Sequence, residues 1–191
     1  DMLLFAPDVT RGADGRYYLY YVLDQLPVIS VAVCDTPAGR YQFYGYVHHP
    51  DGSRLGEREG DAPQFDPGVL FEGNAVYLYT GFCPPADTNR RGSMVTVLEP
   101  DMLTVRTEPV TVAPSAPYAA GTGFADFPFF EASSIRKAGN TYYFIYSPIS
   151  NHELCYARSS SPLGPFTFAG VIISNSDLHI DTYKPADQPM V

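Results

Sequence analysis

What the sequence lacks excludes two kinds of partner. The 191 residues contain 12 lysines and arginines against 21 aspartates and glutamates, which gives a net charge of −9, and no run of basic residues occurs. Nucleic acids and anionic membranes bind to clustered positive charge, so neither is expected as a partner. The longest aliphatic stretch, around Val28 to Cys34, is far too short to cross a bilayer.

Cysteine is scarce and widely spaced. Cys34, Cys83 and Cys155 form no CxxC pair and no cluster with histidine, so no zinc site is expected. No segment has the density of oxygen ligands found in a calcium loop, and the residues themselves require no cofactor. The odd number of cysteines leans toward a reducing compartment, but the localisation stays open between cytoplasmic and secreted.

Tryptophan is absent, whereas tyrosine (15), phenylalanine (12), proline (18) and glycine (16) are plentiful. Aromatic residues favour strands, and proline and glycine favour turns. Alternation with period 2 dominates, and no segment has convincing helical periodicity. The clearest expected strands are Tyr17–Val22, Val28–Val33, Ala75–Tyr79, Met94–Leu98, Thr141–Tyr146 and Glu153–Ala157. The sequence therefore predicts an all-β fold.

The chain also repeats itself three times, over residues 5–60, 65–113 and 130–175. Each copy opens with Phe5-Ala-Pro-Asp-Val9, Phe65-Asp-Pro-Gly-Val69 or Phe130-Glu-Ala-Ser-Ser134, and a hairpin turn and a tyrosine-rich strand follow. Each copy has room for about four strands. A four-stranded unit that recurs in this way predicts a β-propeller of antiparallel blades, with three blades in this chain.

The residue after the leading phenylalanine is Ala6 in the first copy, Asp66 in the second and Glu131 in the third. The first strand of a propeller blade lines the central channel, so equivalent positions should face one region. Carboxyl groups in such apolar surroundings should have raised pKa values, and two of them in one pocket suit glycoside hydrolysis. The alternatives are an Asp-Pro that only opens a turn and a glutamate that only bonds between blades.

These motifs resemble glycoside hydrolase family 43, the five-bladed propellers that act on arabinose- and xylose-containing glycans. The resemblance rests on Phe5-Ala-Pro-Asp8 before Tyr17-Tyr-Leu-Tyr-Tyr21, on Asp66-Pro67, on Glu131 and on Ser161-Pro-Leu-Gly-Pro-Phe166. It implies that residues 1–191 are a partial catalytic domain holding the second, third and fourth blades. The missing blades would come from the rest of the chain or from self-association.

The resemblance further implies inverting hydrolysis of a pentose-containing oligosaccharide or polysaccharide, as in an arabinofuranosidase or xylosidase. Glu131 would be the general acid and Asp66 would adjust its pKa, while the general base, an aspartate, would lie outside this chain. The expected substrate-binding residues are Phe5, Ala6, Phe65, Phe130 and His152, although packing between blades is an alternative role for Phe65 and Phe130. A channel metal such as calcium is compatible with the complete domain.

Three other functions stay open. Propeller enzymes that act on fructosides also use an Asp-Pro motif and a glutamate, and a related class cleaves glycosides with phosphate instead of water. The third alternative is a non-catalytic propeller that binds glycans.

Overall fold

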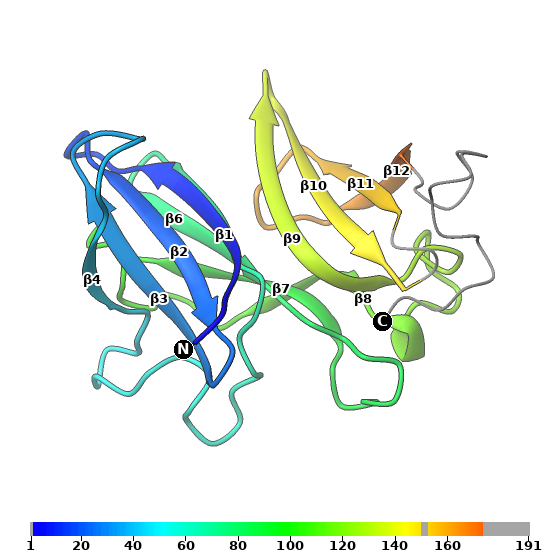
Figure 1. Ribbon diagram of the computed structural model, residues 1–191. Helices are drawn as coiled ribbons and strands as arrows, with labels where there is room; N and C mark the ends of the chain where they lie inside the picture. The colour runs from blue at the N-terminus through cyan, green and yellow to red at the C-terminus, as the bar shows by residue number, and fades with distance from the viewer. Residues whose placement is uncertain (1, 150–152, 174–191) are drawn as a thin grey trace, which may run out of the picture.

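The computed structural model describes residues 2–149 and 153–173, which form three four-stranded antiparallel sheets (Figure 1). The first contains β1 (Leu4–Arg11), β2 (Tyr17–Leu23), β3 (Leu26–Cys34) and β4 (Gln42–Tyr46). The second contains β5 (Gly68–Glu72), β6 (Ala75–Thr80), β7 (Gly92–Leu98) and β8 (Val110–Pro114). The third contains β9 (Phe129–Ala138), β10 (Thr141–Pro148), β11 (Leu154–Ser159) and β12 (Thr167–Ile173). The predicted all-β fold of four-stranded antiparallel blades is confirmed.

The expected strands agree with the observed ones. Five of the six lie inside β2, β3, β6, β7 and β10, and the sixth begins one residue before β11. The hairpin turns are where glycine and asparagine predict them, and Gly73 and Gly139 adopt φ values of +64° and +57° that few other residues tolerate. Among the described residues, the only helical element is a single 3₁₀ turn, η1 (Ala116–Tyr118), and no helix is long and apolar enough to cross a membrane.

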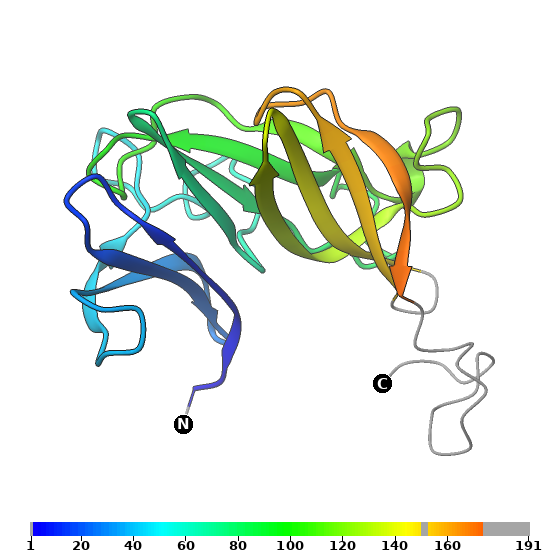
Figure 2. The same cartoon turned by 90° about the horizontal axis from the view of Figure 1, so that it is seen from above.

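The strand order is sequential in every sheet, and β5 lies between β1 and β9 (Figure 2). The three sheets form an arc, with β1, β5 and β9 on its inner side. Because neighbouring strands are antiparallel, the β4–β5 and β6–β7 connections lie at the end of the molecule where the inner strands begin. We call this the entry end; the candidate site lies there.

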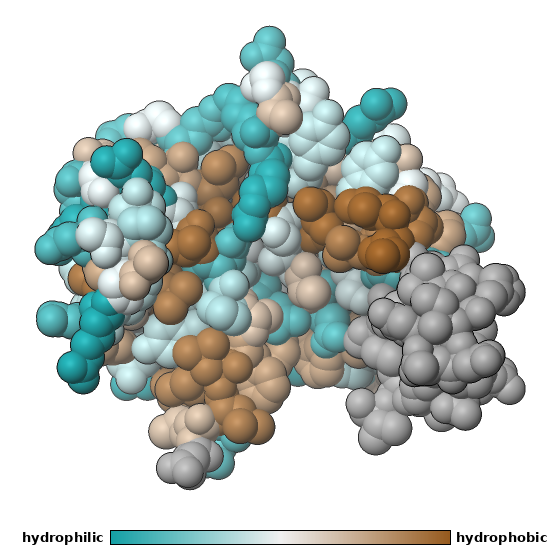
Figure 3. Space-filling model, turned by 45° about the horizontal axis from the view of Figure 1, so that its top comes forward, coloured by the Kyte–Doolittle hydropathy of each residue, from teal (hydrophilic) through white to brown (hydrophobic). Residues whose placement is uncertain are grey.

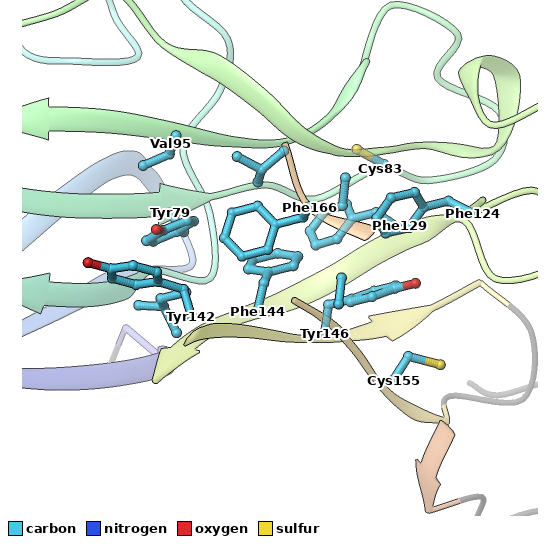
Figure 4. Close-up of a cluster of buried hydrophobic side chains, with 14 of the residues drawn as sticks. Tyr79, Cys83, Val95, Phe124, Phe129, Tyr142, Phe144, Tyr146, Cys155 and Phe166 are labelled. Carbon is cyan, nitrogen blue, oxygen red and sulfur yellow. The ribbon is translucent and has the colours of Figure 1, made fainter. Parts of the chain in front are cut away.

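Two hydrophobic clusters hold the sheets together. One, between the first and second sheets, includes Tyr20, Ile29 and Leu78. The other, between the second and third sheets, includes Tyr79, Phe129, Phe144 and Tyr146 (Figure 4). The second sheet is thus covered on both faces, so five of the six residues of β6 are buried. In contrast, β2 alternates strictly between buried and half-buried residues because its sheet is packed on one face.

Candidate functional site

Four phenylalanine side chains form a row at the entry end. Phe5 lies in β1 and Phe130 in β9, whereas Phe65 precedes β5 and Phe82 follows β6. The successive ring centroids of Phe5, Phe65, Phe82 and Phe130 lie 5.5, 5.2 and 5.4 Å apart. Every member is half-buried, so each ring keeps part of its surface open. The row therefore brings together the three phenylalanines expected from the sequence. Phe82 was missed, because it follows β6 in a loop rather than opening a repeat.

The carboxyl group of Asp66 is buried at the start of the second sheet. Only 5% of the residue is exposed, and its Oδ2 accepts a hydrogen bond of 3.0 Å from the backbone N–H of Ala132 in β9. Burial is the main reason that the pKa of Asp66 is raised to about 6; the Ala132 hydrogen bond lowers it and the nearby charge of Glu131 contributes to the rise. This carboxyl group therefore titrates well above an ordinary aspartate.

Glu131 belongs to the adjacent inner strand, β9, where it pairs with Ser147 of β10. It is half-buried, and this burial raises the pKa of its carboxyl group. The Asp66 carboxyl group accepts its hydrogen bond from Ala132, the residue after Glu131, so the two acidic residues adjoin each other. A carboxyl group with a raised pKa keeps its proton to higher pH than an ordinary glutamate, which favours a role as proton donor.

The structure corrects the alignment that placed Asp66 and Glu131 at equivalent positions. In β1, Phe5 pairs with Val22 and Asp8 with Tyr20; in β9, Glu131 pairs with Ser147 and Ser134 with Ile145. The strands β1 and β9 therefore contain the same bulge, and Glu131 occupies in β9 the position that Phe5 occupies in β1. Asp66 corresponds instead to Ala6 and Ala132. The neighbouring phenylalanines Phe129 and Phe130 shifted the sequence alignment by one residue.

The backbone supports this corrected register. Ala6, Asp66 and Ala132 have φ values of +35°, +46° and +62°, and only one other non-glycine residue among those described has a positive φ. Such a conformation costs an L-residue about 1–2 kcal/mol. Bulges and strained backbone concentrate next to functional sites, where they redirect side chains. Here the bulge lets side chains from non-equivalent positions, Asp66 and Glu131, converge.

Asp8, three residues after Phe5, makes contacts between strands that the sequence did not predict. Its Oδ2 accepts a hydrogen bond of 2.9 Å from the N–H of Val69 in β5, and Arg136 of β9 donates to both of its oxygens at 3.0 and 3.2 Å. The Asp8 side chain is 11% exposed. Its oxygens are thus occupied in joining the three inner strands, which indicates a positioning role.

Two of the expected site residues need separate mention. Ala6 is exposed in the bulge beside Phe5 and offers only a methyl group and backbone to a ligand. His152 lies outside the described residues. Within residues 2–149 and 153–173, no group of three or more histidine, cysteine, aspartate or glutamate side chains could hold a metal ion.

The chain matches a family model and a curated relative over almost its whole length. The model described as glycosyl hydrolases family 43 matches residues 1–189. A xylosidase/arabinosidase of Thermoclostridium stercorarium is 68% identical over 189 residues, which are 99% of this chain and 40% of the relative.

Solved structures also match most of this chain. A β-xylosidase, RS223, superposes with a TM-score of 0.66 and 27% identity over 90% of this chain and 57% of its own. A family 43 β-xylosidase/α-arabinofuranosidase from a compost microbial metagenome, in complex with xylotriose, gives a TM-score of 0.65 at 27% identity, over 88% of this chain and 56% of its own. The chain therefore spans less than three fifths of each of these proteins.

Proposed function

The chain belongs to glycosyl hydrolase family 43, and we propose that it supplies the proton-donating half of a glycosidase site that cleaves xylose- or arabinose-containing glycans. The main support is the pair of adjacent carboxyl groups, Asp66 and Glu131, whose pKa values are both raised at the entry end. A glycosidase needs one carboxyl group that remains protonated near its working pH.

In this proposal, Glu131 is the general acid. Its protonated carboxyl group donates a proton to the glycosidic oxygen as the bond to the sugar breaks, so the leaving group departs as a neutral alcohol. Asp66 acts through Glu131: each carboxyl group disfavours ionisation of the other, so the pair retains a proton that Glu131 can donate. Asp66 is therefore a positioning residue.

The sugar is proposed to be a neutral pentose. The T. stercorarium relative is named as a xylosidase/arabinosidase, and one of the solved structures holds xylotriose. The open surfaces of Phe5 and Phe130 are suited to pack on the C–H face of a sugar ring, and Ala6 leaves room beside them.

Inversion would require a second carboxylate to activate water on the opposite face of the sugar, at roughly 6.5–9.5 Å from the acid. We propose that this base is an aspartate outside the chain, on blades that cover the open faces of the first and third sheets. Exposed apolar residues gather on these outer parts of the molecule (Figure 3). Such blades would come from a longer polypeptide or from a second copy.

The substitution Glu131→Gln tests the proposal in the complete gene product. Loss of a general acid lowers turnover by about 10²–10⁴-fold, so we expect kcat on xylobiose to fall by at least about 100-fold with an unchanged circular dichroism spectrum. The matched control is Glu108→Gln, whose side chain is 86% exposed; it should leave kcat unaltered. Normal activity of the Glu131→Gln variant on xylobiose would refute the assignment.

A further inference from the structure

The residues on both sides of Glu131 are held by hydrogen bonds from the second sheet. Before it, the carbonyl oxygen of Phe130 accepts a hydrogen bond of 2.8 Å from the backbone N–H of Cys83. After it, the backbone N–H of Ala132 donates to Asp66 at 3.0 Å. Glu131 therefore lies in a short segment of β9 whose position depends on how the second sheet packs against the third.

The backbones of these two sheets approach each other closely beside the bulge. A Cβ atom at Gly68, in β5, would lie 2.6 Å from the carbonyl oxygen of Ser133. A Cβ atom at Gly81, directly after β6, would lie 3.0 Å from the Cα of Ser93 in β7. Only glycine allows contacts as close as these. Because so little space separates the two sheets, a shift in one must be accommodated by the other.

Four buried polar residues form a chain of hydrogen bonds across this contact. Gln64 Oε1 accepts a hydrogen bond of 2.8 Å from Thr80 Oγ1. Ser93 Oγ donates to the carbonyl oxygen of Thr80 at 3.3 Å and lies 3.0 Å from Ser133 Oγ. A hydroxyl group has one proton, so the proton between the two serines comes from Ser133. Each of the four residues is at most 5% exposed.

The two ends of this chain adjoin the two carboxyl groups. Gln64 lies two residues before Asp66, and Ser133 lies two residues after Glu131. A hydrogen bond in such a buried place is costly to break, because the groups left behind have no water to replace their partner. The chain therefore fixes the segment that carries Asp66 relative to the segment that carries Glu131.

We propose that Ser93 and Ser133 are positioning residues, whose hydroxyl groups hold the bulge of β9 where Glu131 can donate its proton. Both act through the backbone of β9 and not by contact with the sugar. The proposal rests on the proposed function, since it takes Glu131 as the general acid. A displacement of about 1 Å can lower the rate of a catalysed step roughly 100-fold. Loss of the chain should therefore impair proton donation more than it impairs the fold.

The test compares two substrates with the complete gene product. Xylobiose needs a proton on its leaving oxygen, whereas the leaving group of 2,4-dinitrophenyl β-xyloside departs without one. We expect Ser93→Ala to lower the ratio of kcat for xylobiose to kcat for the dinitrophenyl substrate at least about fivefold. Partial unfolding would lower both rates alike, so it would leave this ratio at the wild-type value.

The matched control is Thr96→Ala, which removes another buried hydroxyl group from the same strand. Thr96 is 2% exposed and lies two residues before Leu98, which packs between the first and second sheets. Side chains two residues apart lie on one face of a strand, so Thr96 faces the first sheet and not β9. Thr96→Ala should lower the thermal midpoint but keep the wild-type ratio.

A second variant breaks the same hydrogen bond from the third sheet. Ser133→Ala should lower the ratio about as much as Ser93→Ala does, and it decides the question if Ser93→Ala does not fold. Because both hydroxyl groups act through one bond, the variant with both substitutions should fall no further than either single variant. Wild-type ratios in the folded single variants, or losses that multiply in the double variant, would overturn the proposal.

Failure of the proposed function would look different. In that case Glu131→Gln would itself leave the ratio of the two rates unchanged. Hydrogen exchange measured by mass spectrometry, on the peptide that contains Ala132, then tests without substrate whether the chain holds the bulge. We expect this peptide to exchange at least about threefold faster in Ser93→Ala than in Thr96→Ala. Equal exchange in the two variants would overturn the holding role of Ser93.

Discussion

At the scale of single residues, the buried carboxyl group of Asp66 opposes folding. Its pKa is raised from 3.8 to about 6, mainly because burial disfavours the charged form. The folded protein therefore binds the proton more tightly than the unfolded chain, and stability falls as the pH rises between these two values. A shift of about two units corresponds to roughly 3 kcal/mol lost above pH 6.

The substitution Asp66→Asn should recover this free energy. The asparagine side-chain oxygen can still accept the hydrogen bond from Ala132, but it never has to carry a charge. We expect the variant to be more stable than the wild type by roughly 3 kcal/mol near pH 8, with a much smaller gain near pH 4, where the aspartate is protonated in the folded protein and partly protonated in the unfolded chain. Urea unfolding of the variant and the wild type at the two pH values measures this difference in stability.

The exposed Asp35→Asn change is the control, and it should show no such trend. A gain from Asp66→Asn that is equal near pH 4 and near pH 8 would show that burial of the charge is not its cause.

At the scale of strands, the sequence predicts more of the fold than of the site. Alternating tyrosines and valines locate the strands, and Gly73 and Gly139 locate turns, because both signals are local. The bulge is a matter of pairing between strands: whether Asp66 or Glu131 corresponds to Ala6 depends on which residue of the neighbouring strand each one faces. Because Phe129 and Phe130 lie directly before Glu131, the sequence alone could not distinguish the two registers.

Asp8 joins the three inner strands, so its removal should destabilise the fold. Asp8→Ala leaves the N–H of Val69 without its acceptor, and removing a charged hydrogen-bond partner from a largely buried site costs about 1–3 kcal/mol. Arg136→Ala should cost less than about 1 kcal/mol, because the Arg136 side chain is 57% exposed and its ion pair is screened by solvent. Chemical denaturation compares the two variants. Equal losses would refute the view that the bond to Val69 is the main contribution.

At the scale of the whole molecule, the outer sheets differ from the middle one. The far face of the third sheet has a shallow depression of about 370 Å³ lined by Tyr143, Ile145, Tyr156 and Ile172, with Arg136 beside them. Ile172 and Ile173, in the edge strand of this sheet, are 52% and 53% exposed. Contiguous apolar surface of this kind usually marks an interaction site. The family resemblance suggests further blades as its cover, and the same surface could bind a second copy.

Comparison of residues 1–191 alone with the complete gene product tests this view. If the proposed blades cover these faces, the isolated chain should associate with itself in gel filtration and should show no turnover of aryl pentosides, because the proposed general base lies on those blades. The complete product should be monodisperse and active. A monomeric isolated chain with full activity would contradict both expectations.

The most direct test of the central claim, that Glu131 donates the proton, is the dependence of the Glu131→Gln variant on the leaving group. A 2,4-dinitrophenyl β-xyloside needs no protonation to leave, whereas xylobiose does. With the complete gene product, we expect kcat for xylobiose to fall at least about 100-fold, while kcat for the dinitrophenyl substrate falls less than about tenfold. Equal losses on both substrates would show that Glu131 is not the acid.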